Sequence, residues 1–240
     1  MTLFLSRARL KREPSISALT RLLLPEEAGP RAEASHRLVW SLFASDPDAK
    51  RDYLFREISP GSGLGRDTGF MVLSRRLPDR NNPILDVETK EFAPALKVGD
   101  RLGFSLRANP TRTRKDENGN VRRHDVVMDA LFKEASRADV RRDIIDREGR
   151  RWFLAQAARS GFKVVQDDES PDEKEDKLAL HIDGYDQWRF SRLGKAGRIS
   201  VLGFSGAIEI VDPALFLEKV ANGIGRAKAY GCGLILIRRS

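Results

Sequence analysis

Two successive sets of short apolar segments constrain the fold of this chain most, because both sets predict a similar order of strands and helices. Apolar residues that alternate or run together over a few positions indicate strands, whereas apolar residues three and four positions apart indicate helices. In the first half of the chain, these patterns predict strands at 3–10, 52–58, 69–74 and 88–96 and a helix at 32–44. The order β-α-β-β-β, with its second helix short or lost, is that of a split βαβ, ferredoxin-like domain.

The second half of the chain repeats this order. Its patterns predict strands at 102–108, 162–165, 188–190, 198–211 and 233–237 and helices at 150–160 and 214–222. Residues 109–125 are basic and contain glycine, which indicates a loop. We therefore predict an α+β fold of two tandem ferredoxin-like (RRM-like) βαββαβ domains packed together. The N-terminal domain is expected at residues 1–98 and the C-terminal domain at 99–240.

Composition excludes several classes of protein. The chain has 240 residues and one cysteine, Cys232, which excludes a disulfide framework and any site built from several of its own cysteines. Cys232 lies between two glycines and is expected to be a small packing residue. No segment is long and apolar enough for a transmembrane helix, and the N-terminal residues place apolar before basic side chains, the reverse of a secretory signal. We expect a cytoplasmic protein.

The charge of the chain is divided unevenly. Its 43 Lys and Arg residues exceed its 35 Asp and Glu residues, for a net charge of +8. Residues 167–176, DDESPDEKED, carry seven acids and one lysine and are expected to form a solvated, mobile loop. The remaining residues carry +14, and their densest clusters of bases lie in the second half. This balance favours a polyanionic partner, with nucleic acid as the leading class.

Two basic segments are candidates for phosphate binding. Residues 223–233, GIGRAKAYGCG, contain four glycines, and the backbone N–H groups of such a turn can hold phosphate oxygens. The segment is neither a P-loop, because the GxxxxGK[ST] pattern is missing, nor a dinucleotide fingerprint, because it follows a helix. It can also be a plain connection. Residues 192–198, RLGKAGR, are either a hairpin that follows RNA phosphates or an ordinary charged hairpin.

No pair of the three histidines has the spacing of metal ligands. His124 and His181 are expected to be surface residues. His36 lies at the edge of the apolar face of the helix predicted at 32–44. An edge position suits a titratable group that faces a cleft, because an imidazole exchanges protons near neutral pH. The alternative is a histidine that only packs beside the core.

Several motifs together carry a family resemblance. They are HRLVWSLF at 36–43, DYLFR at 52–56, LRANP at 106–110, the segment 194–206, Asp212-Pro213 and GIGRAKAYGCGL at 223–234. With these motifs the chain resembles the CasE family, the CRISPR precursor-RNA endoribonucleases of type I-E systems. The resemblance runs from the first predicted strand to the C-terminus, and its RANP and GIGRAKAYGCGL stretches are specific in combination.

The resemblance implies two ferredoxin-like domains and cleavage of CRISPR repeat RNA at the base of its stem-loop, without a metal or other cofactor. A 2′-hydroxyl attacks the scissile phosphate and leaves a 2′,3′-cyclic phosphate and a 5′-hydroxyl. The catalytic histidine of the family falls on His36. The mature crRNA stays bound and joins the other subunits of the type I-E surveillance complex, Cascade. The RNA-binding residues expected in this sequence are Arg107, Arg112, Arg192, Lys195, Arg198, Gly223, Gly225, Arg226, Lys228, Gly231 and Gly233.

One position departs from the family. A tyrosine three residues before the histidine is typical of the family, whereas this chain has Glu33 there. Glu33 lies one helical turn from His36 and is the candidate second catalytic group, unless it is a passive surface residue. The departure leaves open a non-catalytic subunit that only binds the stem-loop. A metal-dependent nuclease is disfavoured, because the single dense run of carboxylates is 167–176.

Overall fold

The structure is a computed structural model that describes residues 2–44, 50–58, 69–115, 119–134, 141–166, 178–192 and 195–239. Contacts between Cα atoms divide the chain into two compact units that are discontinuous in sequence. Unit 1 comprises 1–95, 188–198 and 227–234, and unit 2 comprises 96–187, 199–226 and 235–240. The domains expected at 1–98 and 99–240 stay a prediction. The acidic segment 167–176 lies outside the described residues.

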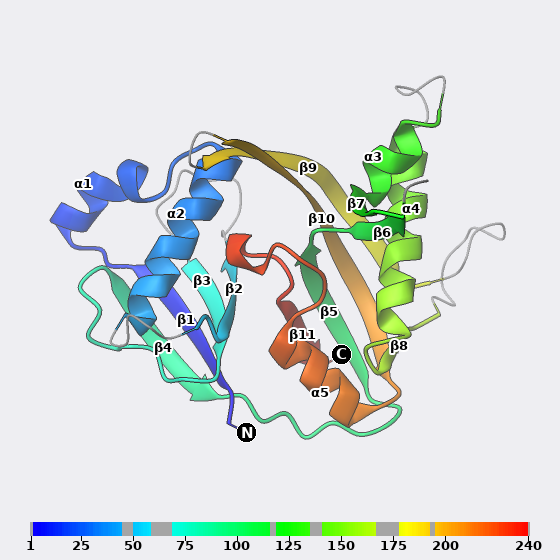
Figure 1. Cartoon of the computed structure of the whole chain (residues 1–240). Helices are drawn as coiled ribbons and strands as arrows, with labels where there is room; N and C mark the ends of the chain where they lie inside the picture. The colour runs from blue at the N-terminus through cyan, green and yellow to red at the C-terminus, as the bar shows by residue number, and fades with distance from the viewer. Residues whose placement is uncertain are drawn as a thin grey trace. The chain divides into compact units, whose positions relative to one another are not determined.

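Unit 1 contains a four-stranded antiparallel sheet (Figure 1). Its strands are β1 (Phe4–Leu10), β2 (Tyr53–Ile58), β3 (Gly69–Ser74) and β4 (Leu85–Glu91), in the order β2-β3-β1-β4. The central strand β3 is buried along almost its whole length, which explains its continuous apolar run. β4 begins and ends earlier than the predicted 88–96, because its exposed face is charged and the apolar alternation there is weak.

Two helices precede β2, namely α1 (Pro14–Leu23) and α2 (Ala28–Trp40), and α2 continues into the 3₁₀ turn η1 (Ser41–Phe43). Helix α2 covers one face of the sheet (Figure 1), and its buried Leu38 and Val39 join the core of unit 1. Full burial of such a side chain contributes about 1.5–3 kcal/mol. The predicted helix began at Ala32 because Gly29-Pro30 indicated a turn, whereas proline is tolerated in the first turn of a helix.

Polar contacts also fix α2 to the neighbouring strand β2. The guanidinium of Arg31 pairs with the carboxylate of Glu57 at 2.6 Å, and Ser35 Oγ donates a hydrogen bond to the same carboxylate at 3.2 Å. The side chains of Arg31 and Glu57 are 25% and 14% exposed, so water screens this pair less than a surface pair. These contacts hold the helix against β2 along the turn that leads into His36.

Unit 2 contains a second sheet in the order β11-β5-β10-β8, with β9 paired to β10. Its strands and helices are β5 (Arg101–Ala108), α3 (Val126–Leu131), α4 (Arg141–Ala157), β8 (Phe162–Val164), β9 (Leu180–Arg192), β10 (Lys195–Ile210), α5 (Pro213–Asn222) and β11 (Ile235–Arg239). The last residues of β9 and the first of β10 belong to unit 1. Phe153 of α4 stacks on Phe104 and Phe204 of the sheet, with ring centroids 4.9 and 5.2 Å apart. The antiparallel sheets with their covering helices confirm the predicted α+β class.

The prediction of a loop at 109–125 was wrong. Strands β6 (Thr111–Lys115) and β7 (Val121–Asp125) form a separate two-stranded antiparallel sheet. Their sequences, TRTRK and VRRHD, lack apolar alternation because neither face of this ribbon is fully buried. Helix α3 was not predicted either. Its N-cap is Asp125, whose side chain accepts a hydrogen bond from the backbone N–H of Met128 at 2.6 Å.

Two further elements of unit 2 are longer than the sequence indicated. Helix α4 begins at Arg141, whereas the predicted helix began at Arg150. Its first turns are mostly charged and show little helical apolar spacing, so the apolar pattern did not indicate a helix there. Strand β9 begins at Leu180, whereas the predicted strand began at Trp188. Exposed and half-buried residues follow Leu180, so no apolar run indicated this part of the strand. Among the described helices, none combines the length and apolar character needed to span a bilayer.

Candidate active site

His36 stands half-exposed on α2, at the point where this helix faces β2. Three aromatic rings surround it, those of Trp40, Tyr53 and Phe55, with ring centroids 6.2, 6.4 and 6.3 Å from the imidazole. The helical arrangement places His36 at the border of the buried face. Ser35, Leu38 and Val39 are buried, whereas His36 is not. An imidazole at the border between core and solvent can exchange protons with a bound molecule.

Tyr53 is the polar neighbour that the structure adds to His36. Its hydroxyl lies 3.5 Å from His36 Nδ1, and its side chain is buried, with the residue 3% exposed. Its ring stacks on Phe43 with a centroid distance of 4.8 Å, which fixes the direction of the hydroxyl. Burial raises the pKa of Tyr53 well above its ordinary value. The phenol therefore stays uncharged throughout the pH range in which a histidine titrates.

The second half of the glycine-rich segment packs beside this histidine within unit 1. The 3₁₀ turn η2 (Lys228–Tyr230) contacts both α2 and β2. Gly231 follows it with φ 76°, and a Cβ at this position would lie 3.3 Å from Cε2 of Phe55, one of the rings around His36. A side chain at Gly231 would be strained by both the backbone and the contact. The sequence of this turn thus brings the half-buried Lys228 to the same unit as His36.

The end of the long hairpin is the third part of this arrangement. Phe190 of β9 stacks on Tyr230 of η2, with centroids 4.8 Å apart and planes 20° apart. A Cβ on Gly29 would lie 1.7 Å from the carbonyl oxygen of Arg189, so only glycine lets the hairpin approach α2 this closely. Arg198 is exposed on β10. The side chains of Arg192 and Lys195 lie outside the described part of the chain.

Of the remaining residues predicted to bind RNA, Gly233 belongs to unit 1, with φ 92°, and five belong to unit 2. These five are Arg107, Arg112, Gly223, Gly225 and Arg226. Arg226 is exposed, and its backbone forms an isolated β-bridge with Asn109. The buried Asn109 donates a hydrogen bond from Nδ2 to the carbonyl oxygen of Ser200 on β10 at 2.7 Å. Asn109 of the RANP stretch therefore ties the glycine-rich segment to the sheet.

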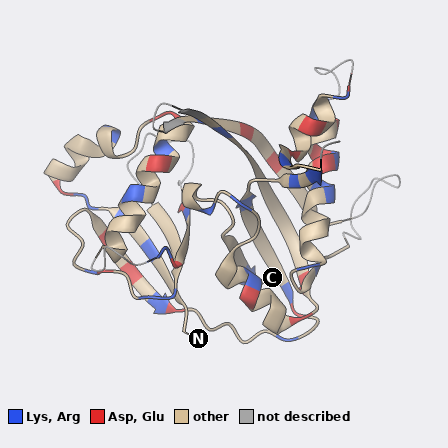
Figure 2. Cartoon of the chain, in the orientation of Figure 1, with Lys and Arg blue, Asp and Glu red and all other residues tan. Residues whose placement is uncertain are grey.

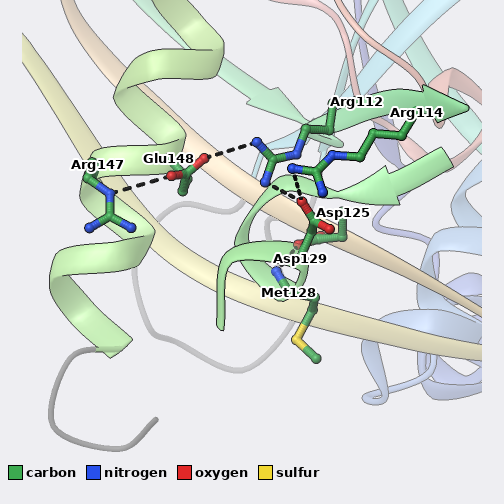
Figure 3. A network of polar contacts seen from close by, with 7 residues as sticks. All are labelled: Arg112, Arg114, Asp125, Met128, Asp129, Arg147 and Glu148. Atoms are coloured by element: carbon green, nitrogen blue, oxygen red, sulfur yellow. Dashed lines mark hydrogen bonds and ion pairs between the residues drawn. The ribbon is translucent and has the colours of Figure 1, made fainter. Parts of the chain in front are cut away.

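Arg112 lies in an ion-pair network of unit 2 (Figure 3). Its guanidinium contacts Asp129 of α3 and Glu148 of α4, the latter at 3.6 Å, and Arg114 pairs with Asp129 at 2.9 Å. Figure 2 shows the opposite charges interspersed in this part of the chain. Arg112 is thus held by two carboxylates, which it shares with Arg114 and Arg147. Its role in RNA binding stays a prediction.

Comparison with known proteins decides the family. A family model described as CRISPR associated protein matches residues 3–239. The chain is also 32% identical over 209 residues to the CRISPR system Cascade subunit CasE of Escherichia coli (strain K12), across 83% of this chain and 88% of that protein. The chain belongs to the CasE family of CRISPR-associated proteins. The resemblance found in the sequence motifs is confirmed.

Two further matches extend the comparison for this CasE-family chain. The CRISPR-associated endoribonuclease Cse3 of Thermus thermophilus is 25% identical over 235 residues, 91% of this chain and 98% of that protein. A solved structure of Thermus thermophilus Cse3, bound to an RNA representing a pre-cleavage complex, matches with a TM-score of 0.68 at 22% identity. That match covers 99% of this chain and 100% of the other, and it confirms the fold of two tandem ferredoxin-like domains.

The structure thus places some predicted site residues of this CasE-family member in unit 1, with His36, and others in unit 2. His36, Lys228 and Gly231 gather around α2 and β2, and Glu33 lies half-buried one turn before His36. Sequence reasoning missed Tyr53. A signal was present, because Tyr53 and Phe55 alternate along β2 and so point to the same face of the sheet. Cys232 is fully buried, as expected for a packing residue.

Proposed function

We propose that this chain is a metal-independent endoribonuclease that cuts CRISPR repeat RNA at the base of its stem-loop and keeps the mature crRNA bound. The observation that carries the proposal is the half-exposed His36 beside the glycine-rich turn, in a chain of the CasE family. The relatives support it by name, one as an endoribonuclease and one as a Cascade subunit. Among the described residues, no three His, Cys, Asp or Glu side chains cluster as metal ligands do.

The reaction needs proton transfer and charge stabilisation. The 2′-oxygen of the nucleotide before the cut forms a bond to phosphorus while the bond from phosphorus to the 5′-oxygen breaks. The 2′-hydroxyl loses its proton and the 5′-oxygen gains one, which leaves a 2′,3′-cyclic phosphate and a 5′-hydroxyl. His36 serves one of these two transfers, a contribution of about 10²–10⁴-fold in rate. Lys228 and the backbone N–H groups of its turn stabilise the negative charge of the phosphorane.

RNA recognition rests on charge and shape. The deep major groove of an A-form stem is closed to most side chains, so phosphates and flanking single-stranded bases are the accessible features. Arg198 and Arg226 are exposed cations on segments that the sequence marked for RNA binding. Each phosphate contact releases condensed counterions, which predicts affinity that falls steeply with salt. The bound product then takes its place among the other subunits of Cascade.

The test is single-turnover cleavage of a stem-loop RNA that carries the CRISPR repeat of the source genome, in buffer with EDTA. We expect cleavage of the all-ribose RNA and none of an RNA with a 2′-deoxy nucleotide before the cut. His36→Ala should lower the rate by about 10²–10⁴-fold. The matched control is His181→Ala, an exposed histidine of β9, which should cut at the normal rate. Equal cleavage of the two RNAs, or no cleavage in EDTA, would contradict the mechanism.

The position of Glu33 favours one alternative, a non-catalytic subunit that binds the stem-loop. The carboxylate of Glu33 replaces the phenol that is typical of the family one turn before the histidine. Tight, salt-sensitive RNA binding without cleavage after long incubation would establish this alternative. The same assay therefore decides between the two functions.

A further inference from the structure

The contact between β2 and His36 assigns a role to a residue outside the sequence motifs considered catalytic. We infer that Tyr53 is the positioning residue of His36, because its buried hydroxyl holds Nδ1 and thereby fixes the direction of the imidazole that exchanges protons with the RNA. This inference rests on the proposed function, because it names the residue that orients its central side chain. Tyr53 touches the imidazole and lies too deep to touch the RNA, with 3% of its surface exposed.

The surroundings of Tyr53 make its hydroxyl a fixed point. The ring lies between Phe43, Trp40 and Phe55, with centroid distances of 4.8, 6.1 and 6.4 Å. A buried hydroxyl is costly to leave unpaired, and within the described part of the chain this hydroxyl meets His36 Nδ1. The distance of 3.5 Å is at the long end for a hydrogen bond, as is common before a substrate tightens a catalytic site.

A phenol suits an imidazole that changes its protonation state during a reaction. The hydroxyl can donate to an unprotonated Nδ1 and can accept from a protonated one, so the contact survives both states. Because the phenol stays uncharged, it orients the ring without adding a negative charge beside it, unlike the aspartate of a serine-protease triad. The bond made by one ring nitrogen sets the direction and the role of the other. Tyr53 thereby fixes the orientation of the imidazole ring.

The inference also accounts for the departure at Glu33. A hydroxyl reaches the imidazole from the strand rather than from the preceding helical turn. The Tyr53 phenol therefore lies beside His36, although helix α2 itself contains no tyrosine. Glu33 is then not needed to orient the ring.

The experiment compares Tyr53→Phe with Tyr185→Phe in ¹⁵N NMR of the imidazoles and in single-turnover cleavage. Tyr185 is a matched control, because it is a part-buried tyrosine of unit 2 whose hydroxyl lies within hydrogen-bond distance of Ser200 Oγ and Asp125 Oδ1. The His36 signals are those lost in His36→Ala. We expect Tyr53→Phe to shift the Nδ1 signal of His36 and to lower the single-turnover rate constant about tenfold, as for one lost hydrogen bond, with little change in the concentration that gives half the maximal rate. Tyr185→Phe should leave the His36 signals and the single-turnover rate constant unchanged.

Several outcomes would overturn the inference. An unchanged Nδ1 signal in Tyr53→Phe would show that the hydroxyl does not hold this nitrogen. A rise in the half-saturating concentration without a fall in the single-turnover rate constant would show a structural or binding role instead. If Tyr53→Phe fails to fold, the wild-type spectrum still decides, because an Nδ1 signal typical of a nitrogen without a hydrogen bond contradicts the contact. The NMR readout needs no activity, so a chain that fails to cut RNA contradicts the proposed function and leaves this inference testable.

Discussion

Replacing Gly29 with alanine tests how closely the β9–β10 hairpin packs on α2. The new Cβ would lie 1.7 Å from the carbonyl oxygen of Arg189 and 2.6 Å from its carbonyl carbon. A relaxed carbon–oxygen contact needs about 3.3 Å or more, so helix and hairpin must separate by roughly 1.6 Å. Because the carbonyl group of Arg189 belongs to the backbone, no change of side-chain rotamer relieves this contact.

Two free-energy terms of opposite sign decide the outcome of this substitution. Alanine favours the helix by at most about 1 kcal/mol over glycine, and less in the first turn. Overpacking costs about 1–3 kcal/mol, with a rigid backbone at the upper end of that range. We expect a net loss of about 2 kcal/mol of unfolding free energy, or about 4–8 °C in melting temperature for a chain of this size. The displaced hairpin should also weaken RNA binding.

The assay combines thermal unfolding with equilibrium RNA binding, both in a His36→Ala background so that the RNA stays intact. The control is Gly149→Ala in α4, where the added Cβ would meet side-chain methyl groups of Ile182 and Leu202 at 3.3 Å and no backbone atom that close. That control should change stability by less than about 1 kcal/mol and leave RNA affinity unchanged. If Gly29→Ala were as stable as its parent and bound RNA equally well, the close packing of the hairpin on α2 would be refuted.

Three further predictions follow from buried polar groups. Asn109→Ala removes the side-chain donor to the carbonyl of Ser200 and should lower the unfolding free energy by about 1–3 kcal/mol, measured by chemical denaturation. An unchanged denaturation midpoint would contradict the role of Asn109 in tying the glycine-rich segment to the sheet. Asp129→Asn removes the carboxylate shared by two arginines and should cost about 2 kcal/mol, which urea titration measures, and no loss would show a dispensable network. The raised pKa of Tyr53 means that the folded state disfavours its ionised form, so stability is lost as pH rises above the ordinary value of 10.0. Tyr53→Phe should therefore lose less stability between pH 9 and about 11 than the wild type, and an equal loss in both would refute this.

The strands of both sheets were largely predictable because their apolar periodicity is a local property of the sequence. β1, β2, β3 and β5 lie within a residue or so of the predicted ranges. The ribbon of β6 and β7 escaped prediction, since its arginine-rich strands have no buried face and give no apolar pattern. The predicted helix at 150–160 was too short for a similar reason, because the N-terminal turns of α4 are mostly charged.

The parts of the site that depend on the type and local position of a single residue were predictable. His36 could be recognised from its place at the edge of a helical apolar face and from the motif around it. Arg112 could not be assessed in this way, because the two carboxylates that engage it come from α3 and α4. The sequence shows that a charge is present, but the distance to its partners decides whether that charge is available to RNA.

The amino-acid sequence by itself determined the family, the α+β class and the candidate proton-transfer residue, because each rests on local spacing or residue type. Only the tertiary structure decided the partner of that residue. Tyr53 lies 17 positions from His36 and on a different element, and the pairing of α2 with β2 places the two side chains in contact. A hydrogen bond depends on a few tenths of an ångström, a quantity set by packing between elements and not by the periodicity within either one.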